Sequence, residues 1–271
     1  MPLHLIVDSH VHSQYSPDSQ ISAKEGILTA LKNGLGGLAF TDHYEFDYPR
    51  KDFAFHFDPQ DRSLVFDNLN HEFEGKFKIL KGLELGYCPH SLQQARQLVA
   101  AHEFDFIIGS VHVVDNIDAG DNSFHQGKTK QQACQRYLEE IYNAVHQLDC
   151  FDVIGHIGYV RRYLASSDKS LRYSDYADYL DAILKKAIDK GKGIEVNTSG
   201  CYHKDLCTPI PDYDVLTRYK ELGGTIVTIG SDSHQIQNIG HSFGQVLDKL
   251  KAAGFEYVAH FEKRKPVFVK I

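Results

Sequence analysis

The sequence has no tryptophan, a single methionine, and no apolar run that approaches the roughly 18 residues of a membrane span. None of its five cysteines forms a CxxC pair, and a chain of this size does not need disulfides to hold a fold, so we expect reduced thiols. The N-terminus enters an apolar stretch with no basic segment ahead of it, which gives no sign of a secretory signal. These absences predict a soluble, cytoplasmic protein with no membrane partner.

The sequence also has fewer basic than acidic residues. The 29 Lys and Arg residues stand against 36 Asp and Glu, which gives a formal net charge of −7. An acidic protein is poorly suited to holding nucleic acid through non-specific phosphate contacts, so we expect no nucleic-acid partner. The composition is otherwise that of a globular domain, with 42% hydrophobic residues, and it leaves the oligomeric state open.

Short runs rich in valine, isoleucine and phenylalanine alternate with longer stretches of helical periodicity. The predicted strands cover residues 3–8, 38–41, 77–85, 104–111, 151–155, 193–197 and 225–230. Helices are predicted from Ser22 and Thr129, which are capping residues, and over residues 174–190 and 211–222. Strand and helix in alternation indicate parallel βα units, arranged either as a doubly wound sheet or as a barrel.

The barrel is the better prediction, because no GxGxxG, GxxxxGKS or GxxxxGKT motif follows a strand to support a nucleotide-binding sheet. No linker, repeat or low-complexity segment divides the chain, so residues 1–271 are predicted to form one α/β domain, a (β/α) barrel somewhat smaller than the eightfold kind. Residues 44–70 form a long aromatic insertion, which we expect to be a lid or wall loop over the strand ends.

Histidine is abundant, with 16 in 271 residues, and many of these residues follow the predicted strands. Six of the seven strands run into His, Asp or Glu at their C-terminal ends. These residues are Asp8, His10, His12, Asp42, His43, Glu84, His112, His156, Asp232 and His234. In a barrel all such ends open on one face, where folds of this type carry their chemistry. The pattern therefore predicts a metal site at the C-terminal ends of the strands.

The spacing of these residues suits shared ions. His10 and His12 are two apart on an extended segment, so both side chains leave the same side of the strand. Asp232 and His234 repeat that spacing, and a carboxylate such as Glu84 can bridge two cations. Nitrogen and carboxylate ligands without cysteine favour Zn, Mn or Fe. A single histidine would as readily be an ordinary core or surface residue, and the agreement of six strand ends is what favours metal.

Ten histidines lie away from these strand ends. His203 follows the sixth strand and is a candidate substrate contact. The others are expected at the surface, namely His4, His56, His71, His90, His102, His125, His146, His241 and His260.

The order of these motifs resembles the polymerase and histidinol phosphatase (PHP) superfamily and, within it, the monofunctional histidinol-phosphate phosphatases. The resemblance spans nearly the whole chain and rests on DSHVHSQYSPDS, TDHYEFDYP, GLELGY, GSVH, GHIGYVRRY, EVNTSG and GSDSHQIQNIG. It implies a distorted (β/α)7 barrel that holds two or three divalent metal ions and hydrolyses phosphoesters.

The resemblance also implies a role for individual residues. The implied ligand sets are His10, His12, Glu84 and Asp232 for the first metal, Glu84, His112 and His156 for the second, and Asp18, His43 and His234 for the third. Some relatives carry histidine where Asp18 stands. Asp8 is expected to orient a ligand histidine, and Asp42 either does the same or caps a turn.

Such a site would attract and activate a phosphate ester. Three divalent ions outweigh three carboxylates in charge, which would draw a phosphate dianion into the pocket. We expect a metal-bridging hydroxide to attack the phosphorus in line. Arg161 and Arg162 are candidate substrate contacts because a guanidinium can bond two phosphate oxygens, and Arg161 is the predicted clamp. Asp18 and His43 are candidate proton donors to the leaving alkoxide, although a metal-bound group donates poorly.

The resemblance implies hydrolysis of L-histidinol phosphate to L-histidinol and phosphate in histidine biosynthesis, so a small-molecule phosphate ester is the expected partner. The alternative is a PHP-type phosphodiesterase or exonuclease on nucleoside bisphosphates or short oligonucleotides. The net charge and the lack of a basic, aromatic groove stand against it. A non-catalytic metal-binding module predicts lost ligands, and none is lost. An amidohydrolase stays open, because metals on a barrel rim also hydrolyse amides.

Overall fold

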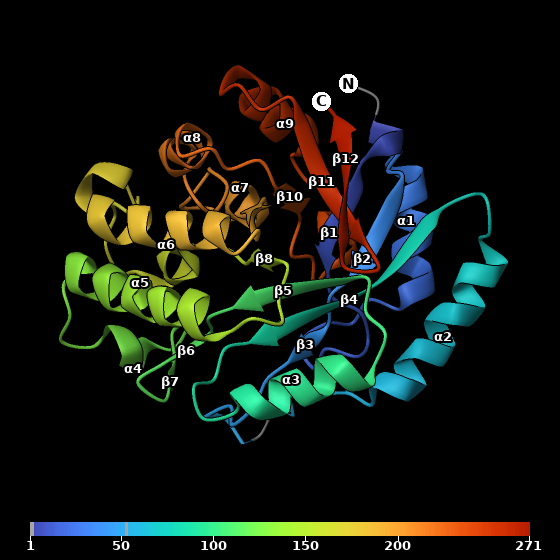
Figure 1. The fold of residues 1–271 in the computed structure, drawn as a ribbon, viewed down its shortest axis with the longest axis horizontal. Helices are drawn as coiled ribbons and strands as arrows, with labels where there is room; N and C mark the ends of the chain where they lie inside the picture. The colour runs from blue at the N-terminus through green and yellow to red at the C-terminus, as the bar shows by residue number, and fades with distance from the viewer. Residues whose placement is uncertain (1–2, 52–53) are drawn as a thin grey trace.

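Parallel strands form a nearly closed barrel at the centre of the molecule (Figure 1). The computed structural model describes residues 3–51 and 54–271. The strands around the barrel are β1 (Val7–Val11), β2 (Gly37–Phe40), β4 (Lys78–Gly86), β5 (Phe106–Ser110), β8 (Val153–Ile154), β9 (Gly193–Asn197) and β10 (Val227–Gly230). All neighbours in this order pair in parallel. The predicted (β/α)7 barrel is confirmed.

The barrel closes where β10 meets β1. Val11 forms a parallel bridge with Ser233 just beyond β10. The backbone N–H of Asp232 donates to the carbonyl of His10 at 2.7 Å, and that of His12 donates to the carbonyl of Ser233 at 3.0 Å. Closure of the barrel therefore brings the first and last predicted ligand segments of the chain side by side.

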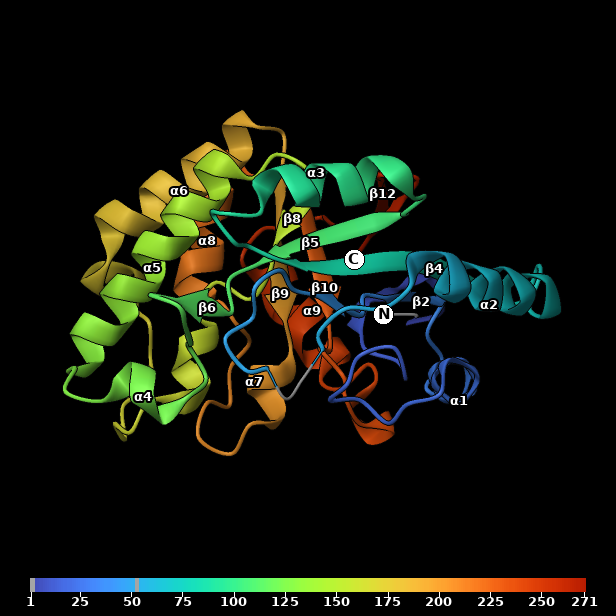
Figure 2. The same ribbon diagram turned by 90° about the horizontal axis from the view of Figure 1, so that it is seen from below.

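The longer helices cover the outside of the barrel, and the short α7 follows the C-terminal end of β9 (Figure 2). The helices are α1 (Ala23–Lys32), α2 (Pro59–Glu72), α3 (Leu92–Ala101), α4 (Asn122–His125), α5 (Lys130–Gln147), α6 (Ala177–Asp189), α7 (Ser199–Tyr202), α8 (Tyr213–Glu221) and α9 (Phe243–Ala252). Ser22 caps α1 by accepting from the backbone N–H of Glu25, and Thr129 and Gln132 form a complete capping box on α5. The helix starts predicted at these two caps are confirmed.

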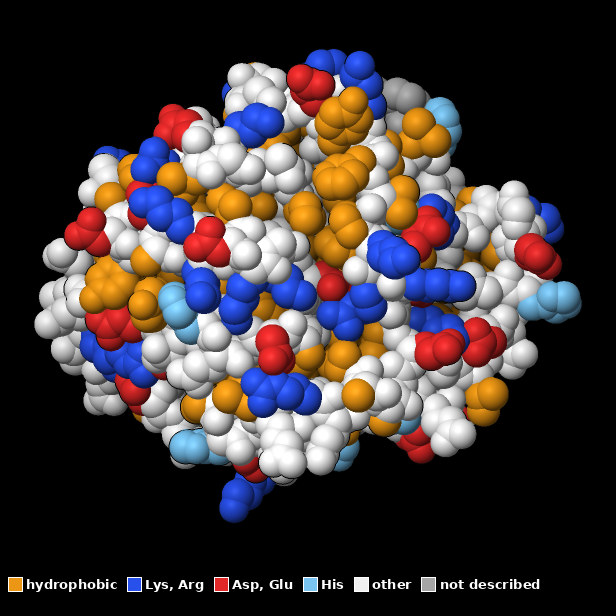
Figure 3. Space-filling view, in the orientation of Figure 1, with side chains coloured by type: hydrophobic (Ala, Val, Ile, Leu, Met, Phe, Trp, Pro, Cys, Tyr) orange, Lys and Arg blue, Asp and Glu red, His pale blue; other side chains and the backbone are white. Residues whose placement is uncertain are grey.

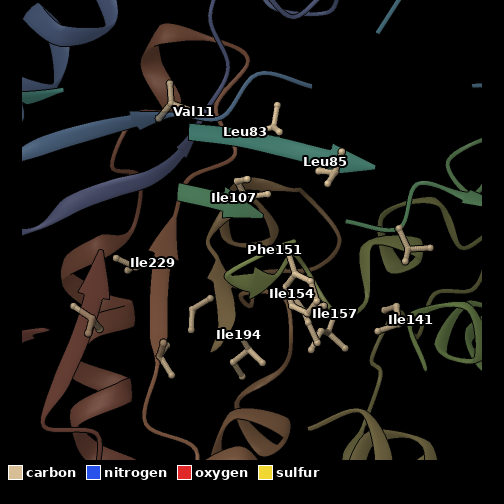
Figure 4. Close-up of a cluster of buried hydrophobic side chains, with 14 of the residues drawn as sticks. Val11, Leu83, Leu85, Ile107, Ile141, Phe151, Ile154, Ile157, Ile194 and Ile229 are labelled. Carbon is tan, nitrogen blue, oxygen red and sulfur yellow. The ribbon is translucent and has the colours of Figure 1, made fainter. Parts of the chain in front are cut away.

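The pleat of the strands separates the core from the site. Leu83 and Leu85 of β4 belong to the hydrophobic cluster shown in Figure 4, together with Ile107 of β5 and Ile229 of β10. Glu84 lies between the two leucines and is also fully buried. Because side chains alternate across a strand, Glu84 points to the opposite face from Leu83 and Leu85. The hydrophobic packing of the leucines thereby fixes where the carboxylate points.

Two N-terminal features differ from the sequence prediction. The first strand begins at Val7, which pairs with Gly37 where β2 begins, and Leu3–Leu5 form a 3-10 turn. In the insertion over residues 44–70, residues from Pro59 onward form helix α2, which Asp58 caps. α2 packs along β4, so this part of the insertion is a helix and not the loop that the sequence predicted.

A C-terminal hairpin, absent from the sequence prediction, pairs β11 (Tyr257–Glu262) with β12 (Lys265–Lys270). Phe261 stacks on Phe106 of β5 with ring centroids 5.2 Å apart, in a cluster that also contains Val7 and Leu80. Val7, Leu80 and Phe106 lie near the N-terminal ends of their strands. The hairpin therefore covers the end of the barrel opposite the C-terminal strand ends, where the predicted ligands lie. His260, which we expected at the surface, is buried there at 4% exposure.

Short elements complete the chain. They are β3 (His43–Tyr44), which pairs with β4, the small hairpin of β6 (Val113–Val114) and β7 (Ile117–Asp118), and the 3-10 turns Tyr159–Tyr163, Tyr173–Asp175 and Ile236–Asn238. Figure 3 shows acidic and basic side chains interspersed on one face of the molecule, with hydrophobic ones over the C-terminal hairpin. Within the described residues, no helix is long and apolar enough to cross a membrane.

Candidate metal centre

The predicted ligand residues converge at the C-terminal ends of the strands. Four sets of three residues each bring their possible ligand atoms within 4.8 Å of one another. These sets are His12, His43 and His234; His10, His12 and Asp232; His43, Glu45 and His112; and Glu84, His112 and His156. Nearly all of these side chains are buried. Six distant segments of the chain therefore meet in one small volume.

The first ligand set has the spacing of a metal site. His10 Nε2 and His12 Nε2 lie 3.1 Å apart, and each is 3.3 to 3.5 Å from Asp232 Oδ1. Tetrahedral ligands at zinc bond lengths are separated by about 3.4 Å. These three atoms could therefore share one tetrahedral ion without rearrangement.

Glu84 faces two groups of histidines with its two oxygens. Its Oε1 lies 2.9 Å from His156 Nε2 and 3.3 Å from His112 Nε2. Its Oε2 is buried and lies 2.9 Å from His43 Nδ1, 3.3 Å from His10 Nε2 and 3.4 Å from His12 Nε2. This arrangement fits the implied bridging role of Glu84 between two metals.

The third ligand set is more open to solvent. Asp18 Oδ2 lies 3.2 Å from His234 Nε2 and 3.5 Å from His43 Nε2, and the two imidazole nitrogens are 3.5 Å apart. The side chains of Asp18 and His234 are 37% and 27% exposed, whereas those of the first set are at most 4% exposed. The geometry fits a third ion with freer access to solvent.

Two buried glutamates outside the predicted ligand sets orient ligand histidines. Glu195 Oε1 lies 2.5 Å from His10 Nδ1, and Glu45 Oε1 lies 2.5 Å from His112 Nδ1. A carboxylate accepts the N–H of Nδ1, which leaves the lone pair of Nε2 directed at the metal position. The sequence analysis missed both residues. The available signals were a glutamate within an apolar strand and an acidic residue two positions after His43.

The buried carboxylates give the site a negative charge that cations would neutralise. Burial alone would lower histidine pKa values, but neighbouring carboxylates, Glu195 and Glu84 foremost, raise the pKa of His10 well above its usual value. Against the same effect of burial, Glu84 raises the pKa of His43 to about 10 and that of His112 well above normal. Without metal, these carboxylates therefore hold protons on three imidazoles. Divalent ions would supply the same positive charge, so the donor set fits them.

A cavity opens beside the ligands. It is lined by Asp18, His43, Glu45, Tyr48, Phe55, His112, His156, Tyr159, Arg162, Tyr163, Asp232 and His234. Tyr48 donates a hydrogen bond to Asp118 Oδ2 at 2.6 Å and so ties the segment after β3 to β7. This segment, the early part of the 44–70 insertion, forms a wall of the cavity as predicted.

The two arginines have different surroundings. Arg162 lines the cavity, pairs with Asp232, donates to Ser199 and lies over the ring of Tyr159 at 5.0 Å. Arg161 is 2% exposed, and its guanidinium bonds the Lys169 carbonyl at 2.7 Å and Asp212 at 2.9 Å. This geometry does not fit the prediction that Arg161 clamps phosphate, because its donors already bind other parts of the chain.

The structure places His203 and Asp8 outside the cavity lining. His203 does not line the cavity, and its Nδ1 is buried without a hydrogen-bond partner. Among the described residues, no imidazole forms a hydrogen bond with Asp8. It accepts the backbone N–H groups of His10, Ser231 and Gly240 at 3.3, 2.8 and 2.9 Å, and burial raises its pKa to about 6. Asp8 thus ties β1 to the loop after β10.

Comparison with known proteins agrees with this geometry. The PHP domain model matches residues 8–199. The chain belongs to the PHP family. Among its PHP relatives, a probable histidinol-phosphatase of Clostridium acetobutylicum is 31% identical over 96% of this chain and 98% of its own length. The histidinol-phosphatase of Lactococcus lactis is 32% identical over 96% of this chain and 95% of its own length.

A solved structure is similar over the whole fold. The histidinol phosphate phosphatase of Lactococcus lactis, in complex with zinc, L-histidinol and phosphate, superposes with a TM-score of 0.89. The two proteins are 30% identical, and the match covers 97% of this chain and 98% of the other.

Proposed function

We propose that this PHP protein is a metal-dependent phosphomonoesterase that hydrolyses L-histidinol phosphate to L-histidinol and phosphate in histidine biosynthesis. The observation that carries the proposal is its full-length likeness to a histidinol phosphate phosphatase that binds zinc, L-histidinol and phosphate. The converging ligands of this chain support the same chemistry, since every implied ligand is present with a suitable neighbour.

Divalent metals bound here would supply the charge that polarises a phosphate and the acidity that makes water a nucleophile at neutral pH. The protein's own part is to hold and orient. Arg162 faces the cavity and is placed to bond a phosphate oxygen. Asp18 and His43 lie on the more open side of the site and are candidates to pass a proton to the leaving alkoxide.

We also propose that the site binds two or three divalent metal ions. Zinc is the first candidate, and the same imidazole and carboxylate donors would also accept Mn or Fe. We propose that residues 1–271 act as one PHP-type phosphatase domain in the cytoplasm, where the five cysteines, all free in the structure, would stay reduced. The substrate is a small phosphate ester, and no nucleic acid is required.

Hydrolysis of three substrates tests the proposal, measured as phosphate release from the two phosphomonoesters and as chromatographic detection of the mononucleotide from the dinucleotide. The purified protein is assayed on L-histidinol phosphate, a nucleoside bisphosphate and a dinucleotide, each with and without a chelator. We expect the highest kcat/KM on L-histidinol phosphate and loss of activity on chelation. Glu84→Gln, which removes the bridging charge, is the matched inactive control. A preference for either nucleotide would support the phosphodiesterase alternative and overturn the proposed substrate.

A further inference from the structure

His12 differs from His10 and His112 in the hydrogen-bond partner of its Nδ1, the ring nitrogen that faces away from the proposed metal position. The Nδ1 atoms of His10 and His112 each face a carboxylate, whereas His12 Nδ1 faces the hydroxyl of Ser16 at 3.0 Å. A hydroxyl can donate as well as accept, so by itself it does not decide which nitrogen of the imidazole carries the proton. The choice matters, because His12 Nε2 must carry a lone pair to bind a metal.

The surroundings of Ser16 remove this ambiguity. The Ser16 hydroxyl donates to Asp42 Oδ1 at 3.2 Å, and it accepts from the backbone N–H of His43 at 3.1 Å. Asp42 as a carboxylate only accepts, so the single hydroxyl proton of Ser16 is directed to it. In this arrangement the oxygen of Ser16 offers only lone-pair density to His12, and His12 Nδ1 is the donor. His12 Nε2 is left unprotonated and aimed at His10 and Asp232.

Asp42 is in turn held by Arg62 of α2. Arg62 Nε donates to Asp42 Oδ2 at 2.7 Å, and its terminal nitrogen donates to the Phe40 carbonyl at 2.5 Å. The guanidinium lies 4.7 Å from the ring centroids of both Phe57 and Phe66. Arg62 is 2% exposed and Asp42 is fully buried. A buried carboxylate needs such a partner to stay ionised, and these rings fix the orientation of the guanidinium.

We propose that Arg62 is a positioning residue for the metal centre, which acts through Asp42 and Ser16 to hold His12 in the tautomer that leaves Nε2 free to bind metal. This inference rests on the metal centre of the proposed function. It extends that centre to helix α2, on the outside of the barrel, since Arg62 does not line the cavity. A purely structural role, in which the ion pair only fastens α2 to the barrel, is the competing explanation.

The hydrogen bonds from Arg62 through Asp42 and Ser16 to His12 form a relay. The zinc affinity of Ser16 variants tests its last link, from Ser16 to His12. Ser16→Ala removes the acceptor for His12 Nδ1, and we expect zinc affinity, measured by competition with a chromophoric chelator, to fall by about 10 to 100-fold. Ser16→Thr keeps the hydroxyl and should restore most of the affinity. In 15N-labelled, metal-free protein, the His12 ring signals should report one tautomer in the wild type and a mixture in Ser16→Ala. Equal zinc affinity and one unchanged tautomer in Ser16→Ala would overturn the proposal.

A double-mutant cycle tests the link to Arg62. We expect Arg62→Met to weaken zinc binding in the wild type and to add no further loss in Ser16→Ala, because both changes break the same relay. Arg264→Met is the matched control, since Arg264 pairs at 2.5 Å with the buried Asp152 at the other end of the barrel. The control should lower the thermal midpoint without changing zinc affinity.

The outcomes separate the explanations. Additive losses in the cycle, or an Arg62→Met protein that loses only thermal stability, would show a structural role and overturn the proposal. If Arg62→Met does not fold, the Ser16 variants and their tautomer signals still decide whether His12 is held in this way. A wild-type protein that binds no zinc would refute the proposed function itself, which is a different result from wild-type binding that the variants leave intact.

Discussion

Glu84 is central to the site because its two oxygens face different groups of histidines. Oε1 faces His112 and His156, and Oε2 faces His10, His12 and His43. No other residue type of similar size offers two anionic oxygens in this arrangement, since Asp is shorter and His has no charge to share. Several ligand histidines are oriented by hydrogen bonds from their Nδ1 atoms to neighbouring side chains. Substitution of these neighbours should therefore change metal binding.

Glu195→Gln should weaken zinc binding. The amide keeps the size of Glu195 but no longer supplies the charge that holds the N–H of His10 Nδ1, and it can present its NH2 group instead. We expect a loss of about 10 to 100-fold in zinc affinity, measured by chelator competition. Glu139→Gln, on α5 where Glu139 accepts a hydrogen bond from Tyr179 of α6, is the size-matched control. Unchanged affinity in Glu195→Gln would show that His10 needs no such partner.

Arg162 and Arg161 should give opposite results on substitution. Arg162→Met removes a donor that faces the cavity, so kcat/KM should fall by about 100-fold or more with zinc content preserved. Arg161→Met strands the carboxylate of Asp212 and should cost about 3 to 5 kcal/mol of unfolding free energy with little change in kcat/KM. Steady-state kinetics and urea unfolding measure the pair. The assignment fails if Arg161→Met is the variant that loses catalysis.

At the level of the strands, the site depends on alternation. Glu84 and Glu195 each lie between two apolar residues of their strand, and these neighbours pack outward against the helices. The carboxylates therefore point into the barrel without any special local conformation. The same rule places His10 and His12 on one side of β1 and its continuation.

The C-terminal hairpin should matter for stability and not for catalysis. Phe261 of β11 packs on Phe106 at the barrel end away from the metals, so Phe261→Ala should cost about 3 to 5 kcal/mol. Chemical denaturation measures the loss, and kcat on L-histidinol phosphate is the control, which should stay unchanged at temperatures where the variant is folded. A fall in kcat of the folded variant would connect the hairpin to the active site.

The sequence predicted the elements whose signals are local. Seven apolar runs separated by helical periodicity are enough to indicate parallel βα units, and caps such as Ser22 and Thr129 mark helix starts. The C-terminal hairpin could not be derived in this way, because covering the barrel end depends on contacts between Phe261 and strands far away in the chain. Part of the 44–70 insertion was predicted as loop although Asp58 and Pro59 are standard start signals for helix α2.

The same limit applies to the site. His and carboxylate residues at strand ends were predictable because the barrel brings those ends together by rule. Glu45 and Glu195 were missed because a hydrogen bond to the far side of an imidazole leaves no periodic pattern. The difference between Arg161 and Arg162, adjacent in the chain, depends on which one a 3-10 turn directs to Asp212 and which to Asp232.

For the molecule as a whole, closure of the barrel and formation of the metal centre are coupled. The backbone hydrogen bonds that join β10 to β1 involve His10, His12 and Asp232 themselves. Binding of an ion by these residues would also fasten the two ends of the sheet. Metal binding should therefore raise the thermal midpoint, as ligand linkage requires.

Zinc binding should release protons. Despite the opposing effect of burial, carboxylates raise the pKa of His10, His43 and His112 in the metal-free site, so these imidazoles are protonated near neutral pH and must lose the proton to bind. Affinity should then weaken as pH falls and strengthen as pH rises. Calorimetry in buffers of different ionisation enthalpy should show release of about three protons from these imidazoles per fully loaded chain, in addition to any proton lost by metal-bound water. Proton release near zero would contradict this charge balance.

The most direct test of the account is removal and return of the metal during phosphate release from L-histidinol phosphate. We predict that the isolated protein hydrolyses this ester, that a chelator abolishes turnover as it removes the bound metal, and that zinc, Mn or Fe restores it in proportion to metal content. Turnover that persists in protein shown to be free of metal would contradict the account.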